Sequence, residues 1–317
     1  MTLRLQLPEG FLQDEPKTLI VSASRKRLWA VLLDLTAEFQ RVCDKYGLCY
    51  CAAGGTLIGA LRHKGFIPWD DDVDLIMPRA DFERLCEVAP REFTSPYFWQ
   101  TETTDPFSAR GHAQLRNSAT TGILKDEMLA GRPLFSFNQG VFIDIFPLDH
   151  VPDDPAARAA LCQELSHLRR QTYVARLALA YSRLSPVRFL THPSQLVRWL
   201  QGWWYRLGDV FCGRNRVARL AARIERVAQS YNTTACRQCA AIAFHPDCAP
   251  NDFLETAWFT NLTRVPFEML SLPIPQHAET MLEHQYGNWH EHVLAPSMHG
   301  GLLVDVDRPY TEYFEKR

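Results

Sequence analysis

Long apolar runs are absent from this sequence. No stretch approaches the ~18 consecutive apolar residues that a membrane-spanning helix needs. Residues 1–17 are polar and include Pro8 and Glu15, so they lack the apolar centre of a secretory signal. Hydrophobic residues make up 46% and charged residues 22% of the 317 positions, which excludes disordered, collagen-like and coiled-coil classes. We therefore expect a globular protein of the cytoplasm.

Lysine is missing from residues 156–230, although arginine occurs there thirteen times. Only three acids, Glu164, Asp209 and Glu225, oppose these arginines, so the segment carries +10 and the rest of the chain −12, for a sum of −2. Within it, Leu196–Leu207 combines arginine, tryptophan and apolar residues, which is typical of a helix that lies on a membrane surface. Two interpretations stay open: docking on anionic lipid, or a packed helical subdomain with a solvated basic face. Because no recognition motif accompanies the charge, we expect no nucleic-acid partner.

A disulfide framework is not indicated. The nine cysteines are odd in number, follow no signal sequence and lie mostly in apolar stretches, which is typical of reduced, buried thiols. Cys236, Cys239, His245 and Cys248 offer four ligands that zinc could use. Their spacing is loose, and the residues between Cys239 and His245 are typical of a strand, so we expect no structural zinc there.

The spacing of apolar residues predicts an α+β core, then a helical region, then a segment that returns to the core. A helix is predicted over about 24–46 and ends at Gly47. The elements predicted after it are a strand over 48–53, helical turns over 56–63, a strand over 72–77, a helix over 80–89, strands over 97–102, 112–116, 120–124 and 141–146, helices between 155 and 230 with breaks near Ser185 and His192, a strand over 240–244, and a helix over 276–286.

Three aspartates at alternating positions indicate a candidate metal-binding site. Asp70, Asp72 and Asp74 are two residues apart, and on a strand such residues share a face at spacings of about 6.5–7 Å. Carboxylates crowded on one face repel each other, which raises their pKa unless a cation lies between them. Mg²⁺ suits such an oxygen cluster and completes its octahedron with substrate phosphate and water. Asp71, which has the other parity, is expected to point away.

Gly54 and Gly55 stand between a predicted strand and a predicted helix. The backbone there can approach a ligand closely, and the helix N-terminus presents N–H groups to phosphate. A glycine pair alone is also typical of a plain tight turn. Followed by an Asp-x-Asp strand, it predicts a phosphate site beside a metal site, as phosphoryl transfer requires. Further candidates for phosphate binding, which could equally be ordinary surface charges, are Arg62, Lys64 and Arg116.

The stretch from Gly54 to Leu75 resembles the signature of the LicD family, which belongs to the nucleotidyltransferase-fold superfamily and is related to fukutin-type sugar-chain phosphotransferases. Other matching stretches are Met77–Phe82, Val141–Asp149, Val265–Glu268 and Tyr286-Gly287. The resemblance implies a nucleotidyltransferase-like mixed sheet flanked by helices, with a helical insertion. It divides the chain into a catalytic core over 20–150, an arginine-rich helical region over 151–235, and a C-terminal segment over 236–317 that packs back on the core.

The resemblance also implies roles for single residues. Asp70, Asp72 and Asp74 would bind Mg²⁺, with Mn²⁺ as an alternative, and Asp72 and Asp74 would thereby be catalytic. Asp144 would be the third acid and the general base for the acceptor hydroxyl, unless it is a structural aspartate held by hydrogen bonds. The residues that hold the phosphates of the donor would be Gly54, Gly55 and Thr56.

By the same resemblance, the donor is a CDP-linked alcohol, most typically CDP-choline. The acceptor is a hydroxyl of a cell-surface glycan or glycolipid, such as lipopolysaccharide, and CMP is released. The alternatives are a nucleotidyltransferase or glycosyltransferase that uses Asp-x-Asp on another acceptor, and a non-catalytic relative that acts as a binding module. The location implied is the cytoplasm, with peripheral contact to the inner membrane face through the arginine-rich helices.

Overall fold

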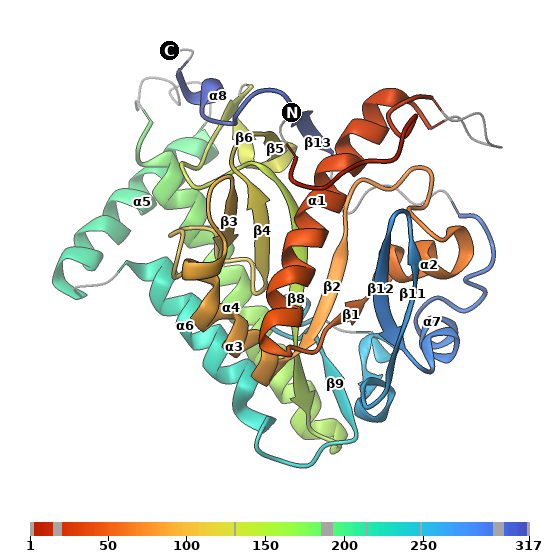
Figure 1. Cartoon of the computed structure of the whole chain (residues 1–317). Helices are drawn as coiled ribbons and strands as arrows, with labels where there is room; N and C mark the ends of the chain where they lie inside the picture. Colours follow the sequence, from red (N-terminus) through yellow and green to blue (C-terminus); the bar gives the residue numbers. More distant parts are fainter. Residues whose placement is uncertain are drawn as a thin grey trace.

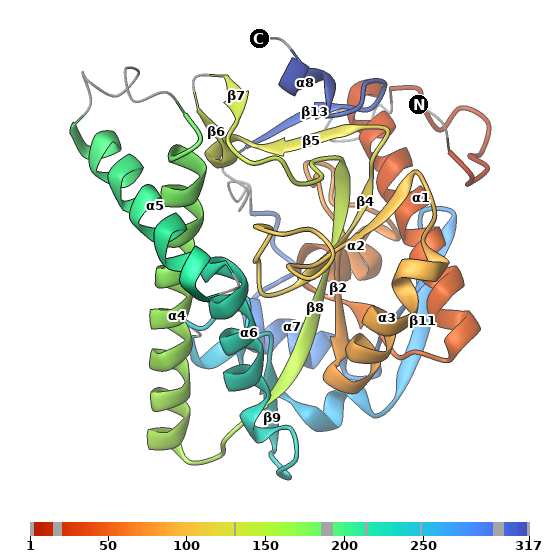
Figure 2. The same cartoon turned by 90° about the vertical axis from the view of Figure 1, so that its left-hand side faces the viewer.

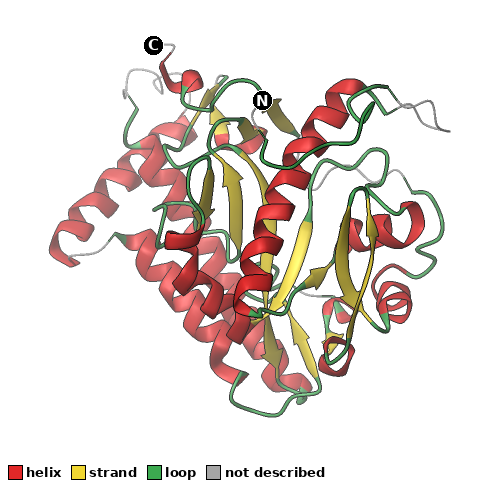
Figure 3. Ribbon diagram, in the orientation of Figure 1, coloured by secondary structure: helices red, strands yellow, loops and turns green. Residues whose placement is uncertain are grey.

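The computed structural model of the protein describes residues 3–14, 21–129, 131–184, 193–212, 215–247, 249–293 and 301–315. A β-sheet occupies the centre, and helices flank it on both sides (Figure 3). The sheet contains parallel and antiparallel neighbours. The predicted α+β architecture, a mixed sheet flanked by helices, is therefore confirmed.

The main path of the sheet has the strand order β1-β2-β8-β4-β3 (Figure 1). These strands are β1 (Cys51–Ala52), β2 (Asp74–Pro78), β8 (Val141–Val151), β4 (Ala113–Asn117) and β3 (Tyr97–Gln100). β2 and β8 are parallel and pair Asp74 with Asp144, whereas the other neighbours on this path are antiparallel. β9 (Gln238–Ala240) extends the sheet from the far end of β8, and β10 (Leu254–Glu255) pairs with β9. The sheet thus joins the first half of the chain to its C-terminal part.

The helix α1 (Ala23–Tyr46) covers one face of this sheet together with α3 (Arg79–Glu92) (Figure 1). Ser22 caps α1 by accepting the backbone N–H of Arg25, and Gly47 ends it with a φ of 63°. Strand residues in this core include Leu75, Met77, Leu115, Ile143 and Ile145. Because side chains alternate across a strand, the intervening residues of β2, β8 and β4 point to the opposite face.

The strand that carries the aspartates begins later than predicted. We expected it over 72–77, but β2 spans Asp74–Pro78, so Asp70 and Asp72 lie in the preceding loop. The carbonyl oxygen of Asp70 accepts from the Arg25 guanidinium at 2.8 Å and from the indole N–H of Trp29 at 2.9 Å. Side chains of α1, rather than a neighbouring strand, therefore hold this part of the backbone.

A helical arm follows β8 (Figure 2). α4 (Pro155–Tyr181) begins at the cap residue Asp154 and packs against α5 (Pro193–Cys212) and α6 (Arg216–Ala228). Its apolar side chains form a second core with Val151 of β8; among them are Leu161, Leu165, Leu168, Val217, Leu220 and Ile224. The breaks predicted near Ser185 and His192 lie outside the described residues.

Several arginines of this arm point inward rather than to solvent. Arg176 donates to the carbonyl oxygen of Phe107 at 2.8 Å and to Glu127 at 3.1 Å. Arg169 donates to the carbonyl oxygen of Ala109 at 3.2 Å. The basic surface of the arm is consequently smaller than its count of arginines suggests.

A buried ion pair joins the arm to the sheet. Arg79, the first residue of α3, donates to both carboxylate oxygens of Asp149 on β8, at 2.7 and 2.6 Å. It also donates to Glu225 of α6 at 2.7 Å. Bidentate pairs of this kind fix the relative orientation of the elements that carry them.

The C-terminal part packs against the core at several points. A hairpin of β11 (Leu262–Phe267) and β12 (Leu270–Pro275) contributes Phe267, Leu272 and Ile274 to the main core. The remaining elements are α7 (Ala278–Tyr286), β5 (Thr121–Leu124) paired with β13 (Leu302–Asp305), β6 (Met128–Leu129) paired with β7 (Arg132–Pro133), and α8 (Glu312–Glu315). Among the described helices, none has the length and apolar character needed to cross a bilayer.

The segment considered for zinc contains a shorter strand than predicted. β9 ends at Ala240, and the expected strand over 240–244 is a turn. Cys239 is buried on β9, and burial raises its pKa to about 12. His245 lies 3.8 Å from Asp252, and Cys248 lies outside the described residues. The expectation that no structural zinc binds there stays a prediction.

Candidate active site

The glycine pair forms the first two residues of α2 (Gly54–His63). Gly54 has a φ of +51°, and a Cβ on it would lie 3.2 Å from Oδ2 of Asp74. A Cβ on Gly55 would lie 2.8 Å from Oδ2 of Asp70. The absence of side chains therefore lets this helix begin against the carboxylates. The cap residue Ala53 offers no side-chain acceptor, which leaves first-turn N–H groups for a ligand.

Backbone contacts bind the start of β2 to the start of α2. The hydroxyl oxygen of the buried Thr56 accepts the N–H of Asp74 at 2.9 Å. The N–H of Ala53 donates to the carbonyl oxygen of Asp74 at 3.1 Å. Thr56 thus positions Asp74, and its contact with a donor phosphate stays a prediction.

Three consecutive aspartates form a cluster before β2. Carboxylate oxygens of Asp70, Asp71 and Asp72 lie within 4.8 Å of one another. The expectation that Asp71 points away is wrong, because these residues lie in a loop and the alternation of a strand does not apply. Asp74 follows at the first position of β2, and its paired residue on β8 is Asp144. The loop and the two strands thus gather five carboxylates in one region.

Burial and mutual repulsion perturb these acids. Burial, above all other influences, raises the pKa of Asp70 to about 6. Burial and the negative charges of Asp74, Asp70 and Asp144 raise the pKa of Asp72 well above its usual value. Oδ2 of Asp70 is buried and has no hydrogen-bond partner in the described part of the chain. A hard divalent cation would reduce the repulsion among these carboxylates and would give Oδ2 of Asp70 a partner. This oxygen-rich donor set therefore fits Mg²⁺ or Mn²⁺.

Asp144 is held by two side chains from β4 and the residue before it. Its Oδ1 accepts from the amide of Gln114 at 2.7 Å and lies 2.8 Å from Nε2 of His112. Burial lowers the pKa of His112, so the ring is neutral at neutral pH, and Nε2 carries the hydrogen that Asp144 accepts. Two donors on one oxygen fix the orientation of this carboxylate.

Arg116 contacts Gln114, which in turn contacts Asp144. Its guanidinium donates to the side-chain oxygen of Gln114, to Oε1 of Gln100 at 2.6 Å and to the carbonyl oxygen of Gly140 at 2.7 Å. The residue is 1% exposed and stacks over the ring of Phe142, and burial lowers its pKa to about 9. Arg116 thus supports Gln114 in this structure, and the phosphate contact predicted for it stays a prediction.

Arg62 and Lys64 lie at the other end of α2. Arg62 donates to the carbonyl oxygens of Trp289 and Glu291 at 2.9 and 3.0 Å. Eight residues of helix separate it from Gly54, which is about 12 Å at 1.5 Å per residue. Lys64 is exposed and ends the helix with a φ of 55°. The fold does not bring these two residues to the aspartates, and their phosphate contact stays a prediction.

Sequence reasoning missed His112 and Gln114. Both alternate with apolar residues just ahead of and within β4, so they share the face of the sheet that carries Asp144. The sequence does contain a pattern that indicates them, because the predicted strand has polar residues at positions 112, 114 and 116. The strand order, which places β4 beside β8, was needed to interpret it.

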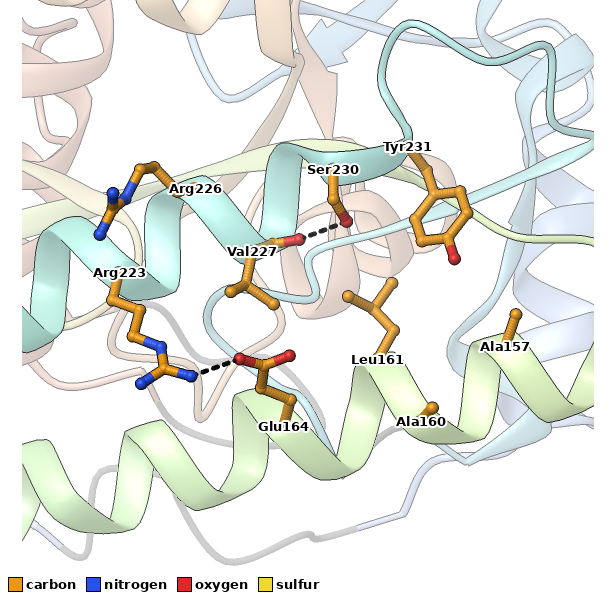
Figure 4. A pocket seen from close by; sticks show the side chains of 9 residues that line it. All are labelled: Ala157, Ala160, Leu161, Glu164, Arg223, Arg226, Val227, Ser230 and Tyr231. Carbon is orange, nitrogen blue, oxygen red and sulfur yellow. Dashed lines mark hydrogen bonds and ion pairs between the residues drawn. The ribbon is translucent and has the colours of Figure 1, made fainter.

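Two cavities differ in their relation to these residues. A cavity of about 900 Å³ lies between α3, α6 and the loop before β4, and its wall includes Arg110 and His112. A groove of about 490 Å³ between α4 and α6 is crossed by the ion pair of Arg223 and Glu164 at 2.8 Å (Figure 4). The groove shares no residue with the carboxylate cluster, whereas the larger cavity reaches the support of Asp144.

The region that contains all five carboxylates matches a known protein family. Residues 47–153 match the family described as LicD/FKTN/FKRP, nucleotidyltransferase domain. The chain contains a LicD-type nucleotidyltransferase domain. This confirms the resemblance seen in the sequence, and the match spans β1 to β8 of the LicD-type domain.

Individual proteins also resemble part of the chain. The lipopolysaccharide cholinephosphotransferase LicD of Haemophilus influenzae is 34% identical over 129 residues, which are 39% of this chain and 44% of that protein. An uncharacterized protein of Rickettsia prowazekii is 35% identical over 60 residues, 19% of this chain and 23% of the relative. The chain therefore matches less than half the length of these relatives.

Proposed function

We propose that this protein is a metal-dependent phosphotransferase. It moves phosphocholine, or a related phospho-alcohol, from a CDP-linked donor to a hydroxyl of a cell-surface glycan or glycolipid. The observation that carries the proposal is the carboxylate cluster at the uncapped start of α2, where a phosphate site adjoins a cation site. The activity named for the Haemophilus influenzae relative supports the choice of donor and acceptor.

Three groups of the site have separate roles in the proposed reaction. Asp70, Asp72 and Asp74 would hold Mg²⁺ or Mn²⁺, and the bound ion supplies charge neutralisation on the diphosphate. The first-turn N–H groups of α2 orient the phosphates of the donor. Asp144, fixed by Gln114 and its neighbour His112, takes the proton of the acceptor hydroxyl.

The bond changes balance without a further reactant. The acceptor oxygen forms a bond to the phosphorus that carries the alcohol, and the bond from that phosphorus to the bridging oxygen breaks. CMP leaves with the electron pair of that bond, and the proton of the acceptor passes to Asp144. Positioning and charge neutralisation are sufficient for such a displacement.

We infer that the acceptor approaches through the cavity of about 900 Å³. His112 forms part of the wall of this cavity and contacts Asp144, so the cavity adjoins the support of the proposed base, although no aspartate of the cluster is among its lining residues. Since the donor is a cytoplasmic nucleotide conjugate, we place the reaction in the cytoplasm, with the acceptor held at the inner membrane face.

The test is CMP release on incubation with Mg²⁺, a lipopolysaccharide or glycolipid acceptor and, separately, CDP-choline, CDP-ethanolamine, CDP-glycerol and CDP-ribitol. We expect release from at least one donor, and its loss on addition of EDTA and in Asp74→Ala. The matched control is Asp44→Ala, which removes a carboxylate that is 66% exposed and paired with Arg264 on the surface. Release only from nucleoside triphosphates or nucleotide sugars would favour the nucleotidyltransferase or glycosyltransferase alternative. Binding of donor without turnover would indicate a non-catalytic binding module.

A further inference from the structure

The outward side of α5 is apolar. Its exposed large side chains, which we call the α5 outer face, are Val197, Leu200, Trp203, Trp204, Leu207, Val210 and Phe211. Trp204, Val210 and Phe211 are 74%, 79% and 88% exposed. Spacings of three and four residues place the set on one side of the helix. Contiguous apolar surface of this kind marks an interaction site.

Contacts on the inner side fix the orientation of the helix. A Cβ on Gly202 would overlap the carbonyl oxygen of Ala178 on α4, so the two helices touch at their backbones. The indole N–H of Trp199 donates to the carbonyl oxygen of Leu184 at 3.0 Å. Leu196 and Trp199 also pack against the core of the arm. The helix therefore already has a buried apolar side, and the α5 outer face is a second one.

The helix that carries the α5 outer face has a small net positive charge, and one of its arginines, Arg206, also donates to Ser182 at the end of α4 at 2.7 Å. Arg198 is exposed, and the Arg206 guanidinium lies 5.5 Å from the ring centre of Trp203. The helix has one acid, Asp209, which is paired with Arg219 at 3.3 Å. Tryptophan and arginine around an apolar stripe are the composition of helices that lie in the headgroup region of a bilayer.

We propose that the α5 outer face binds the surface of a membrane that contains anionic phospholipid. The apolar side chains enter the boundary between headgroups and acyl chains, the tryptophans lie at headgroup level, and the arginines contact lipid phosphates. A second copy of the chain is a poorer occupant, because α5 carries two arginines against one aspartate, and two helices of the same sign of charge repel each other.

The position of α5 connects this surface to the acceptor. The helix ends at Cys212, and Asn215 lines the cavity of about 900 Å³. Three residues span at most about 11 Å, so the cavity lies close to the end of the membrane-bound helix. A glycolipid acceptor held in the membrane would enter there, an inference that rests on the proposed function.

Vesicle sedimentation tests the proposal with the full chain and no nucleotide. We expect the protein to sediment with phosphatidylcholine vesicles that contain phosphatidylglycerol, and to be released by salt. The variant Trp204→Glu/Phe211→Glu should lose at least about a hundredfold in affinity, because burial of each such side chain contributes roughly tenfold or more. Arg198→Glu should weaken binding to the anionic vesicles alone. The matched control places glutamates at two exposed apolar positions elsewhere, Leu12→Glu/Val293→Glu, and should bind as the wild type does.

The outcomes separate this proposal from the proposed function. Absence of sedimentation at low ionic strength, or equal loss in the control variant, overturns it. A wild-type dimer by light scattering that Trp204→Glu/Phe211→Glu dissociates, without vesicle binding, assigns the surface to a second copy and also overturns it. CMP release from a CDP-alcohol and a detergent-dispersed glycolipid acceptor, in vesicle-free solution, checks that the variant is folded. That release survives if only the membrane contact is wrong, and is missing from the wild type if the transferase function is wrong.

Discussion

Replacing Asp70 with asparagine is expected to stabilise the metal-free protein and to abolish transfer. Burial raises the pKa of this carboxyl from 3.8 to about 6, so the folded protein disfavours its charged form. Asparagine has nearly the same shape and no charge. The backbone carbonyl of Asp70, which accepts from Arg25 and Trp29, is unchanged by the substitution.

The magnitude follows from the shift in pKa. Each pKa unit corresponds to about 1.4 kcal/mol, so the change from 3.8 to about 6 sets a ceiling of about 3 kcal/mol on the gain. Unfolding entropy is about 2.1 cal/mol/K per residue, or roughly 0.7 kcal/mol/K for this chain. A gain of about 3 kcal/mol therefore raises Tm by about 4 °C.

The gain depends on pH in a defined direction. Asp70 has a folded pKa above its unfolded value, so its contribution to stability is present below pH ~4 and is lost as the pH rises through about 6. Asparagine has no charge at any pH, so the variant does not lose this stability as the pH rises. The difference in Tm between variant and wild type should be full at pH 8 and should narrow as the pH falls below 6.

Bound metal should cancel most of this difference in stability between variant and wild type. An ion at a hundred times its Kd stabilises the wild type by about 2.7 kcal/mol, and the variant, which lacks one ligand, should gain far less. Differential scanning fluorimetry at pH 8 with EDTA or with Mg²⁺ measures both effects, with Asp44→Asn as the surface control. A variant that is no more stable than the wild type in EDTA at pH 8 would refute the reasoning, as would an undiminished response to Mg²⁺.

Three further predictions concern other parts of the LicD-type domain. Gly55→Ala places a methyl group 2.8 Å from Asp70 Oδ2, so we expect at least a tenfold rise in the Mg²⁺ concentration needed for CMP release, with unchanged far-UV circular dichroism. Arg79→Met leaves the fully buried Asp149 uncompensated and should lower the free energy of unfolding in urea by about 3–5 kcal/mol. Gln114→Leu removes one of the two donors to the carboxylate on β8 and should reduce kcat by about 10–100-fold with little change in KM for the donor, since a hydrogen bond to a charged group contributes about 1.5–3 kcal/mol.

The carboxylate cluster could be predicted from the sequence because its chemistry is local. Asp70, Asp72 and Asp74 lie within five residues, and crowded carboxylates need a cation whatever fold surrounds them. The error over Asp71 has a local cause too. Alternation of side chains applies only within an extended strand, and the strand begins after this residue because the preceding backbone bonds to side chains of α1.

The support of Asp144 could not be predicted in the same way. Arg116 is an arginine on a strand in any reading of the sequence, and exposure to solvent is the ordinary expectation for that residue type. Its burial depends on β4 lying beside β8, where acceptors from Gln100, Gln114 and Gly140 surround it. Those acceptors come from β3, from β4 and from the residue before β8, and the pairing of the strands is set by the packing of the whole sheet.

Contacts at two points join β2 and the first residue of α3 to β8 and fix the number of residues between those points. Asp74 of β2 is paired with Asp144 of β8, and five residues later Arg79, the first residue of α3, donates to Asp149 of β8. Insertion or deletion of one residue within either stretch would turn every later side chain to the opposite face. One such change would separate the acids of the site or break the buried ion pair. In the evolution of this chain, residues in the segments 74–79 and 144–149 can therefore be substituted. Neither segment can gain or lose a residue independently of the other.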